Sequence, residues 1–166
     1  MKFLIHLIAL QRAIDTYRAK GYDERWIAKR IKVLQERKQL TDVWKEGGIK
    51  ENLEFAILTN ETYKSWSGMT ASEYKEFKGL RKENLRDNMD NLELILTDLS
   101  EEATKRLAQK QKPKGLDENI EVARKGGHAA KVARDDIEKS LGESIVSKEN
   151  KLNYKYIEDK QLKDAK

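Results

Sequence analysis

The chain has 166 residues, with 34 Lys or Arg against 29 Asp or Glu, a net charge of +5 and no cysteine. The lack of cysteine excludes disulfides, cysteine-ligated zinc, iron–sulfur clusters and thiol catalysis, and it is compatible with a reducing cytoplasm. Apolar and charged residues each make up 38% of a chain that holds a single proline. This balance predicts one mainly helical domain with a core and heavily charged outer faces.

The first ten residues are apolar apart from Lys2, His6 and the terminal charge. This run is too short for a membrane span, which needs roughly 20 residues. The following ALQRAID is a poor cleavage site for a signal peptide. We therefore predict a helix over about 2–20, ended by Gly21, that lies in the core or at an interface.

Asp23 is a plausible N-cap for a second helix that runs to about Leu40 and buries Trp26 or Ile27. We expect a separate single turn over 41–44, stopped by the glycine pair at 47–48. A third helix should span about 49–64, with an apolar side made of Leu53, Ala56 and Ile57.

The segment 66–99 predicts two helices with a break between them. Thr70 and Glu73 match a capping box for a short helix over 71–77, and Gly79 interrupts it. A long central helix should follow over about 90–109. Its buried stripe is predicted from residues at helical spacing, namely Leu85, Met89, Leu92, Ile95, Leu96 and Leu99.

Pro113 and Gly115 lie in a polar run that predicts a linker-like break over 110–116. Asp117 then caps a helix that we expect to bend near Gly126-Gly127 and to end at Gly142. From these elements we predict a single helical domain over 1–146, an irregular bundle of about five to seven helices. Residues 147–166 are expected to form a polar, mobile tail.

Four segments carry a family resemblance: AIDTYRAKGYDERWIAKRI (13–31), RKQLTDVWKEGG (37–48), KGLRKENLRDNMDNLELIL (78–96) and EVARKGGHAAKVARDDIEKSLG (121–142). Over about 14–148 the chain resembles the C-terminal half of bacterial and prophage antirepressor-like proteins that carry a BRO-type N-terminal domain. More distantly it resembles the C-terminal part of DNA-damage-inducible protein D. The BRO N-terminal domain, expected to bind DNA, has no counterpart in this sequence. The resemblance implies a role in antirepression or the DNA-damage response, and it supplies no catalytic residues.

Basic residues are concentrated in 104–134, which holds nine Lys or Arg against three acids. Such an excess favours an acidic partner, nucleic acid above all. The candidate contacts are Lys105, Arg106, Lys110, Arg124, Lys125, Lys131 and Arg134.

The stretch RKGGHAAK (124–131) admits two interpretations. Backbone N–H groups of Gly126 and Gly127 at the start of a helix would face a phosphate, flanked by basic side chains. Alternatively, the small residues form a seam that lets another helix approach closely. We favour the packing interpretation, although the two are compatible.

A second basic cluster surrounds Gly79 and supplies three further candidates for phosphate contact, Lys78, Arg81 and Lys82. Nearby acids almost match the bases in number, so a solvated, charge-paired face is the favoured alternative.

Aromatic and amide side chains give weaker signals. Trp26, Trp44 and Trp66 suit core anchoring better than stacking on bases. Asn84, Asn88 and Asn91 would read base edges on a recognition helix, but a capping role for Asn88 is simpler.

The sequence contains no recognisable catalytic motif. His6 and His128 are the only histidines and lack the spacing of a metal site. We therefore expect no catalytic residue, no metal and no cofactor, in a cytoplasmic protein that acts without a membrane. The leading hypothesis is a non-enzymatic regulatory module that binds a protein partner, either a repressor, a recombination protein or a defence component. Nucleic-acid binding through 105–134 is the alternative, and a metal-dependent nuclease is a distant third. A homo-oligomer through the apolar N-terminal helix is compatible with each.

Overall fold

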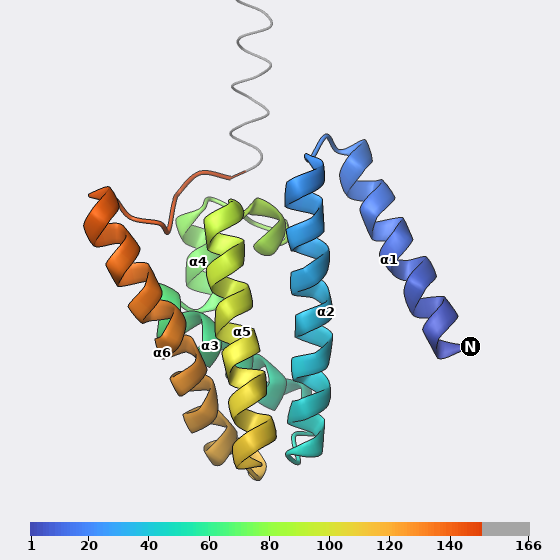
Figure 1. The fold of residues 1–166 in the computed structure, drawn as a ribbon, viewed down its shortest axis with the longest axis vertical. Coiled ribbons are helices and arrows are strands. Elements are labelled where there is room, and N and C mark those ends of the chain that lie inside the picture. Colours follow the sequence, from blue (N-terminus) through green and yellow to red (C-terminus); the bar gives the residue numbers. More distant parts are fainter. Residues whose placement is uncertain (151–166) are drawn as a thin grey trace, which may run out of the picture.

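The computed structural model describes residues 1–150, and all regular structure in this part of the chain is helical (Figure 1). The predicted all-α class and helix number are confirmed. The elements in chain order are α1 (Lys2–Ala19), α2 (Glu24–Glu46), α3 (Asn52–Ser67), α4 (Ala71–Phe77), the 3₁₀ helix η1 (Arg86–Asn88), α5 (Asn91–Gln111) and α6 (Gly115–Leu141).

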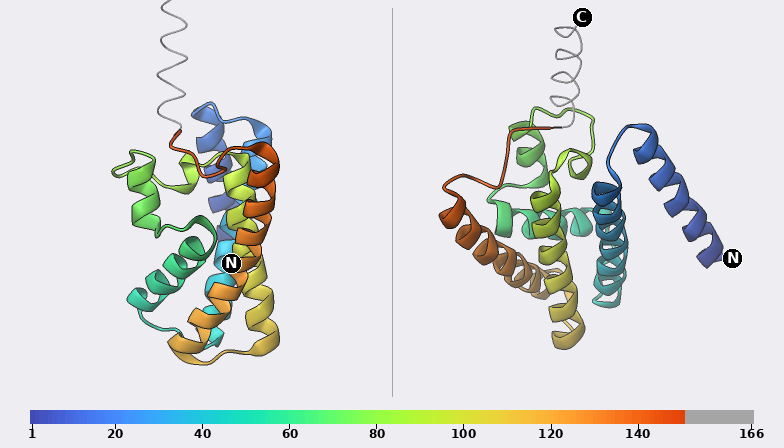
Figure 2. Two further views of the ribbon diagram at one scale, coloured as in Figure 1. Left: turned by 90° about the vertical axis from the view of Figure 1, so that its left-hand side faces the viewer. Right: turned by 45° about the horizontal axis from the view of Figure 1, so that its top comes forward.

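The long helix α5 is central, as predicted. It packs between α2 and α6, and α3 lies against both α5 and α6. Figures 1 and 2 show α2, α5 and α6 as one layer, with α3 and α4 behind it. The N-terminal helix α1 contacts α2 alone among the pairs of helices with substantial contact, and it leans away from the bundle toward its N-terminus.

Helix α2 is longer than predicted. Asp23 caps it as expected, since its side chain accepts from the backbone N–H of Trp26. The helix then continues to Glu46 without a separate turn at 41–44, so that prediction is wrong. Leu40 and Trp44 lie one helical turn apart and are both fully buried, which favours an unbroken helix across the expected boundary.

The predicted apolar side of α3 is also wrong. Leu53 is 71% exposed and Ala56 is exposed, whereas Leu58 and Trp66 are fully buried. A capping box between Glu51 and Glu54 starts the helix at Asn52, three residues later than predicted. At its other end, the helix extends to Ser67, about one turn beyond the predicted end.

The capped helix α4 and the break at Gly79, whose φ is +72°, are confirmed. The stripe predicted for the next helix is only partly right. Leu85 and Met89 are buried but precede α5, while Ile95 and Leu99 are 45% and 38% exposed. Asp90, and not Asn88, caps α5. Polar residues occupy much of the buried face of α5, so the apolar spacing did not indicate which side of the helix is buried. The buried residues are Glu93, Leu94, Leu96, Thr97, Ser100, Glu101, Thr104, Lys105 and Ala108.

Helix α6 runs without interruption for 27 residues, so the bend predicted at Gly126-Gly127 is wrong. Its start is at Gly115, where Asp117 lies in the first turn and no side chain caps the helix. Only a tight connection over 112–114 separates α5 from α6, in place of the predicted longer linker. Gly142 ends the helix in the left-handed conformation, as expected.

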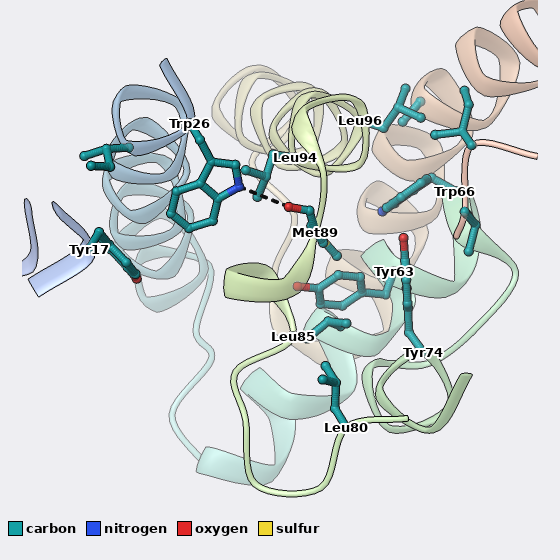
Figure 3. Close-up of a cluster of buried hydrophobic side chains, with 14 residues drawn as sticks. Tyr17, Trp26, Tyr63, Trp66, Tyr74, Leu80, Leu85, Met89, Leu94 and Leu96 are labelled. Carbon is teal, nitrogen blue, oxygen red and sulfur yellow. Dashed lines mark hydrogen bonds between the residues drawn. The ribbon is translucent and has the colours of Figure 1, made fainter. Parts of the chain in front are cut away.

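All three tryptophans anchor the core, as predicted, with exposures of 6% for Trp26 and 0% for Trp44 and Trp66. The buried hydrophobic residues form two clusters. The larger one joins Trp26 and Trp66 with residues of α4, of α5 and of the segment between them, where Leu85 and Met89 flank η1 (Figure 3). The smaller one surrounds Trp44 near the turns at the far end of α2.

The chain after α6 returns to the bundle. Ile145 and Val146 are buried, and the Nδ2 of Asn150 donates to the carbonyl of Lys78. Residues 147–150 are therefore held against α4, and the prediction that a mobile tail starts at 147 is wrong for them. The remainder of the predicted tail lies outside the described residues.

The prediction that the N-terminal helix is a core element is wrong for its first half. Phe3, Leu4 and Ile5 are 76%, 60% and 63% exposed, and Tyr17 is the one buried residue of α1. The alternative, an interface helix, stays a prediction. Within residues 1–150 no helix combines the length and apolarity needed to cross a membrane.

Candidate interaction site

The basic residues of 105–134 do not form the single exposed surface that was predicted. Lys105 is only 9% exposed. Its Nζ lies 2.9 Å from the Glu36 Oε2 and 2.7 Å from the Glu102 Oε2. This amine links α5 to α2 and is not presented to a phosphate backbone.

Lys78 is likewise wrongly predicted as a surface contact, because its side chain is fully buried. Its Nζ lies 2.9 Å from the Glu93 Oε1 and donates to the carbonyls of Ser147 and Glu149, each at 2.8 Å. Burial raises the pKa of the Glu93 carboxyl, and the neighbouring Lys78 acts in the opposite direction. The pair thus holds the C-terminal segment on α4 and α5.

Arg134 is half-buried and closes the C-terminal end of α3. Its Nη1 donates to the carbonyls of Trp66 and Ser67 at 3.2 and 2.8 Å, and its Nε donates to Glu138 at 2.5 Å. Carbonyls at a helix end lack intrahelical partners, so this guanidinium has a structural role.

Gly126 and Gly127 lie in the middle of α6, so the predicted helix start with outward N–H groups does not exist. Both glycines are buried. A Cβ on Gly126 would lie 2.0 Å from the Thr104 Oγ1, and one on Gly127 would lie 2.3 Å from the Ser65 Cβ. The packing interpretation of RKGGHAAK is confirmed, because α6 approaches α5 and α3 through these two positions.

The remaining predicted contacts are more accessible but scattered. Arg124 pairs with Glu61 at 3.0 Å and Glu121 at 3.1 Å, and Lys131 pairs with Asp135. Arg106 pairs with Glu102. Lys110 and Lys125 are exposed on α5 and α6, whereas Arg81 and Lys82 lie in the loop after α4. Figure 1 places the C-terminal end of α5 far from this loop, so these residues do not form one patch.

A different site is present at the upper end of the bundle in Figure 1, where α2 and α5 begin. A pocket of about 280 Å³ lies there, between the starts of these helices, η1 and the C-terminal segment 147–149. We call it the aromatic pocket. Its lining includes Tyr22, Asp23, Trp26, Asp87, Asp90, Glu93 and Glu149.

One wall of the aromatic pocket is a stacked pair of rings. Tyr22 and Trp26 have centroids 4.0 Å apart at an angle of 28°, and Tyr17 packs edge-on against both. The Trp26 Nε1 donates to the Met89 carbonyl at 3.0 Å, and the Tyr22 hydroxyl donates to the Asp87 carbonyl at 2.9 Å (Figure 3 shows the first). Both rings are therefore held in place before any ligand arrives.

The other walls carry carboxylates. Asp23 and Asp90 are exposed and cap α2 and α5, each accepting one backbone N–H at 2.8 Å. Deeper in, Asp87 accepts from the Tyr17 hydroxyl at 2.8 Å and pairs with Arg30 at 2.9 Å. The two caps have no ion-pair partner among the described residues, so the rim of the pocket is negative.

The tyrosines of this wall stay protonated over the physiological range. Burial raises the pKa of Tyr17 to about 12 and that of Tyr22 to about 12. Neutral aromatic faces beside carboxylates suit a guanidinium or ammonium group, which gains ring contact and charge-assisted hydrogen bonds together. No group of three or more His, Cys, Asp or Glu within residues 1–150 is arranged to hold a metal ion.

Sequence reasoning missed this pocket although it identified two of its parts. Asp23 was expected as a cap and Trp26 as a core residue, and both assignments hold. The opposite wall comes from residues more than 60 positions later. Asn84, considered for base reading, instead accepts from the backbone N–H groups of Arg86 and Asp87. Asn88 and Asn91 both line the pocket, and Asn88 is buried.

A comparison with protein-family models matches residues 21–154 to the family described as DinD C-terminal domain. No curated protein matches the chain. The predicted resemblance to the C-terminal part of DNA-damage-inducible protein D is thereby confirmed, whereas the resemblance to BRO-domain proteins stays a prediction. The match contains the entire aromatic pocket and leaves α1 outside.

Proposed function

The chain belongs to the DinD C-terminal domain family, and from this premise we propose that it is a non-enzymatic regulatory domain of the DNA-damage response. It acts by receiving a lysine or arginine side chain of a protein partner in the aromatic pocket. The partner classes that fit this role are a recombination protein, a repressor and a defence component.

The observation that carries this proposal is the pairing of a fixed aromatic wall with two exposed carboxylates. The stacked rings of Tyr22 and Trp26 line one wall of the pocket, and Asp23 and Asp90 supply the negative charge at the rim. A guanidinium placed there replaces water with a ring face and carboxylate oxygens, which is the chemistry that recognises arginine.

The experiment uses the immobilised full chain and a lysate of the native host after DNA damage. The variant Asp23→Asn with Asp90→Asn removes both rim charges, while asparagine preserves the caps of α2 and α5. We expect wild type to retain a specific protein and the double variant to lose most of it, with the largest difference at low salt, where the rim charges are least screened.

A matched control is Asp117→Asn with Glu118→Gln, which removes two exposed carboxylates from the first turn of α6. This variant should retain the partner as wild type does. Retention that is equal in all three proteins, or a wild type that retains no specific protein, would contradict the proposal.

Nucleic-acid binding is the second candidate. A shallow hollow between α3 and α6 is lined by Glu61, Lys64, Ser65, Arg124 and His128. The exposed Lys125 and the half-exposed Lys131 belong to the same stretch of α6. Neutralising Arg124, Lys125 and Lys131 would weaken such binding and reduce its salt dependence. A gel-shift assay at low salt in which wild type forms no complex would dispose of this candidate.

A further inference from the structure

The two halves of the N-terminal helix α1 have different surroundings. Along one face, Ala13, Ile14 and Tyr17 pack against the core of the bundle. The segment 1–8, which we call the α1 tip, extends beyond this contact as α1 leans away from α2 (Figures 1 and 2).

Six large apolar side chains of the α1 tip are exposed by 45% or more, namely Met1, Phe3, Leu4, Ile5, Leu7 and Ile8. Lys2 is the one charged side chain among these residues. A helix segment that is apolar around most of its circumference is ordinarily buried on most sides. Within residues 1–150, the other exposed large apolar residues are dispersed over α3, α5 and α6 and do not form a comparable cluster.

We propose that the α1 tip is a self-association surface, covered in solution by the α1 tip of a second copy of this chain. The two helices pair antiparallel across a twofold axis, so that Leu4 of each copy faces Ile8 of the other. This proposal does not depend on the aromatic pocket, because the α1 tip lies outside the matched residues 21–154.

The size of the surface fits a symmetric dimer. Together the six side chains form a contiguous apolar surface of at least roughly a few hundred Å², the size at which exposed patches mark interaction sites. Stable interfaces bury about 800 Å² per partner. One pair of tips, packed through the stripe that faces the partner, therefore supplies a part of such an interface.

The charge pattern selects a second copy over a different part of the surface. A twofold axis brings each residue of a patch near its own equivalent or a neighbour of it, so a charged patch repels itself. Met1, Leu4, Ile5 and Ile8 follow one stripe of the helix at i, i+3, i+4 and i+7, and all four side chains are uncharged. The stripe is self-complementary, and the rest of the chain is highly charged.

The test is the mass of the full chain by sedimentation equilibrium at tens of micromolar concentration. We expect twice the 19.3 kDa of one chain. The variant Leu4→Glu with Ile8→Glu should weaken the dimer at least a hundredfold, with unchanged helicity by circular dichroism. The matched control Ala28→Glu with Gln35→Glu adds the same charge at exposed positions of α2 and should remain dimeric.

A cross-link tests the geometry without relying on destabilisation. The chain has no cysteine, so Ile5→Cys, next to the proposed axis, should oxidise to a covalent dimer, whereas Ala19→Cys at the far end of α1 should not. A monomeric wild type, a dimer that survives Leu4→Glu with Ile8→Glu, or equal cross-linking at both positions overturns the proposal.

Two further arms separate this proposal from its alternatives. Vesicles of phosphatidylcholine and phosphatidylglycerol in a 3:1 ratio are mixed with the chain, and sedimentation of a monomeric chain with them would assign the tip to a lipid surface and overturn self-association. Asp23→Asn with Asp90→Asn should leave the dimer intact, so a failed pocket and a failed dimer are distinguishable.

Discussion

Gly126 of α6 lies directly against Thr104 of α5, close enough that a Cβ on the glycine would be 2.7 Å from the Thr104 backbone nitrogen. Backbone cannot rotate away as a side chain can, so the distance between these two helices depends on the missing methyl group. The contact between α5 and α6 is one of the most extensive in the fold.

Gly126→Ala is therefore expected to destabilise the protein even though alanine is the better helix former. The overpacking cost of about 1–3 kcal/mol outweighs the gain of about 1 kcal/mol in helix propensity. Urea unfolding followed by circular dichroism measures the change. Ala129→Gly, at an exposed position of the same helix, should cost about 1 kcal/mol through propensity alone. A more stable Gly126→Ala protein would show that α5 and α6 can separate freely.

Lys78→Met is expected to destabilise by about 3–5 kcal/mol, because it leaves the buried Glu93 carboxylate without its counter-charge. It also removes the donor to the carbonyls of Ser147 and Glu149. The double variant Lys78→Met with Glu93→Gln should lose less than the sum of the two single variants. A double-mutant cycle by urea unfolding gives the coupling, and strict additivity would mean that the ion pair contributes nothing.

Stability should fall in alkali because of Tyr17. Burial raises its pKa from 10.0 to about 12, so between these two values the folded state keeps a proton that the unfolded state has lost. The folded state is then penalised as pH rises from 10 to 12, with a slope approaching 1.4 kcal/mol per pH unit. Tyr17→Phe removes this group and should make the profile less steep, while Tyr22, whose pKa is also raised to about 12, keeps its own contribution. Unfolding at several pH values tests it, and parallel curves for the two proteins would refute the assignment.

Asp23→Asn and Asp90→Asn should each change the free energy of unfolding by less than about 0.5 kcal/mol, since asparagine caps as well as aspartate. Asp23→Ala and Asp90→Ala should each cost about 1 kcal/mol through loss of the cap. Thermal unfolding of the four variants checks this difference. If the asparagine variants unfold as readily as the alanine ones, they cannot serve as charge-only probes of the aromatic pocket.

Local signals in the chain predicted most helix ends. Asp23, Thr70 and Gly142 mark boundaries through capping and the left-handed conformation, which depend only on neighbouring residues. The same local reasoning failed at Gly126-Gly127, where it read a helix break. Glycine weakens a helix locally, but close packing against Thr104 and Ser65 holds α6 together across both positions.

Burial of charge was beyond local reasoning as well. Lys78 and Lys105 looked like surface residues, because lysine is seldom buried without a partner. Their partners Glu93 and Glu36 lie 15 and 69 residues away along the chain. Only the tertiary fold brings such pairs together, and it thereby removes both lysines from the predicted basic surface.

The amino-acid sequence alone determined the helical class, the caps of α2 and α4, the tryptophan core and the apolar character of the first helix, since each follows from composition or from spacing within a few turns. Tertiary structure alone decided which face of each helix is buried, which charges are paired and where the aromatic pocket lies. The pocket, for example, lies where α2, η1 and α5 meet. All of these features depend on contacts between segments distant in the sequence, and such contacts leave no periodic signal in any one segment.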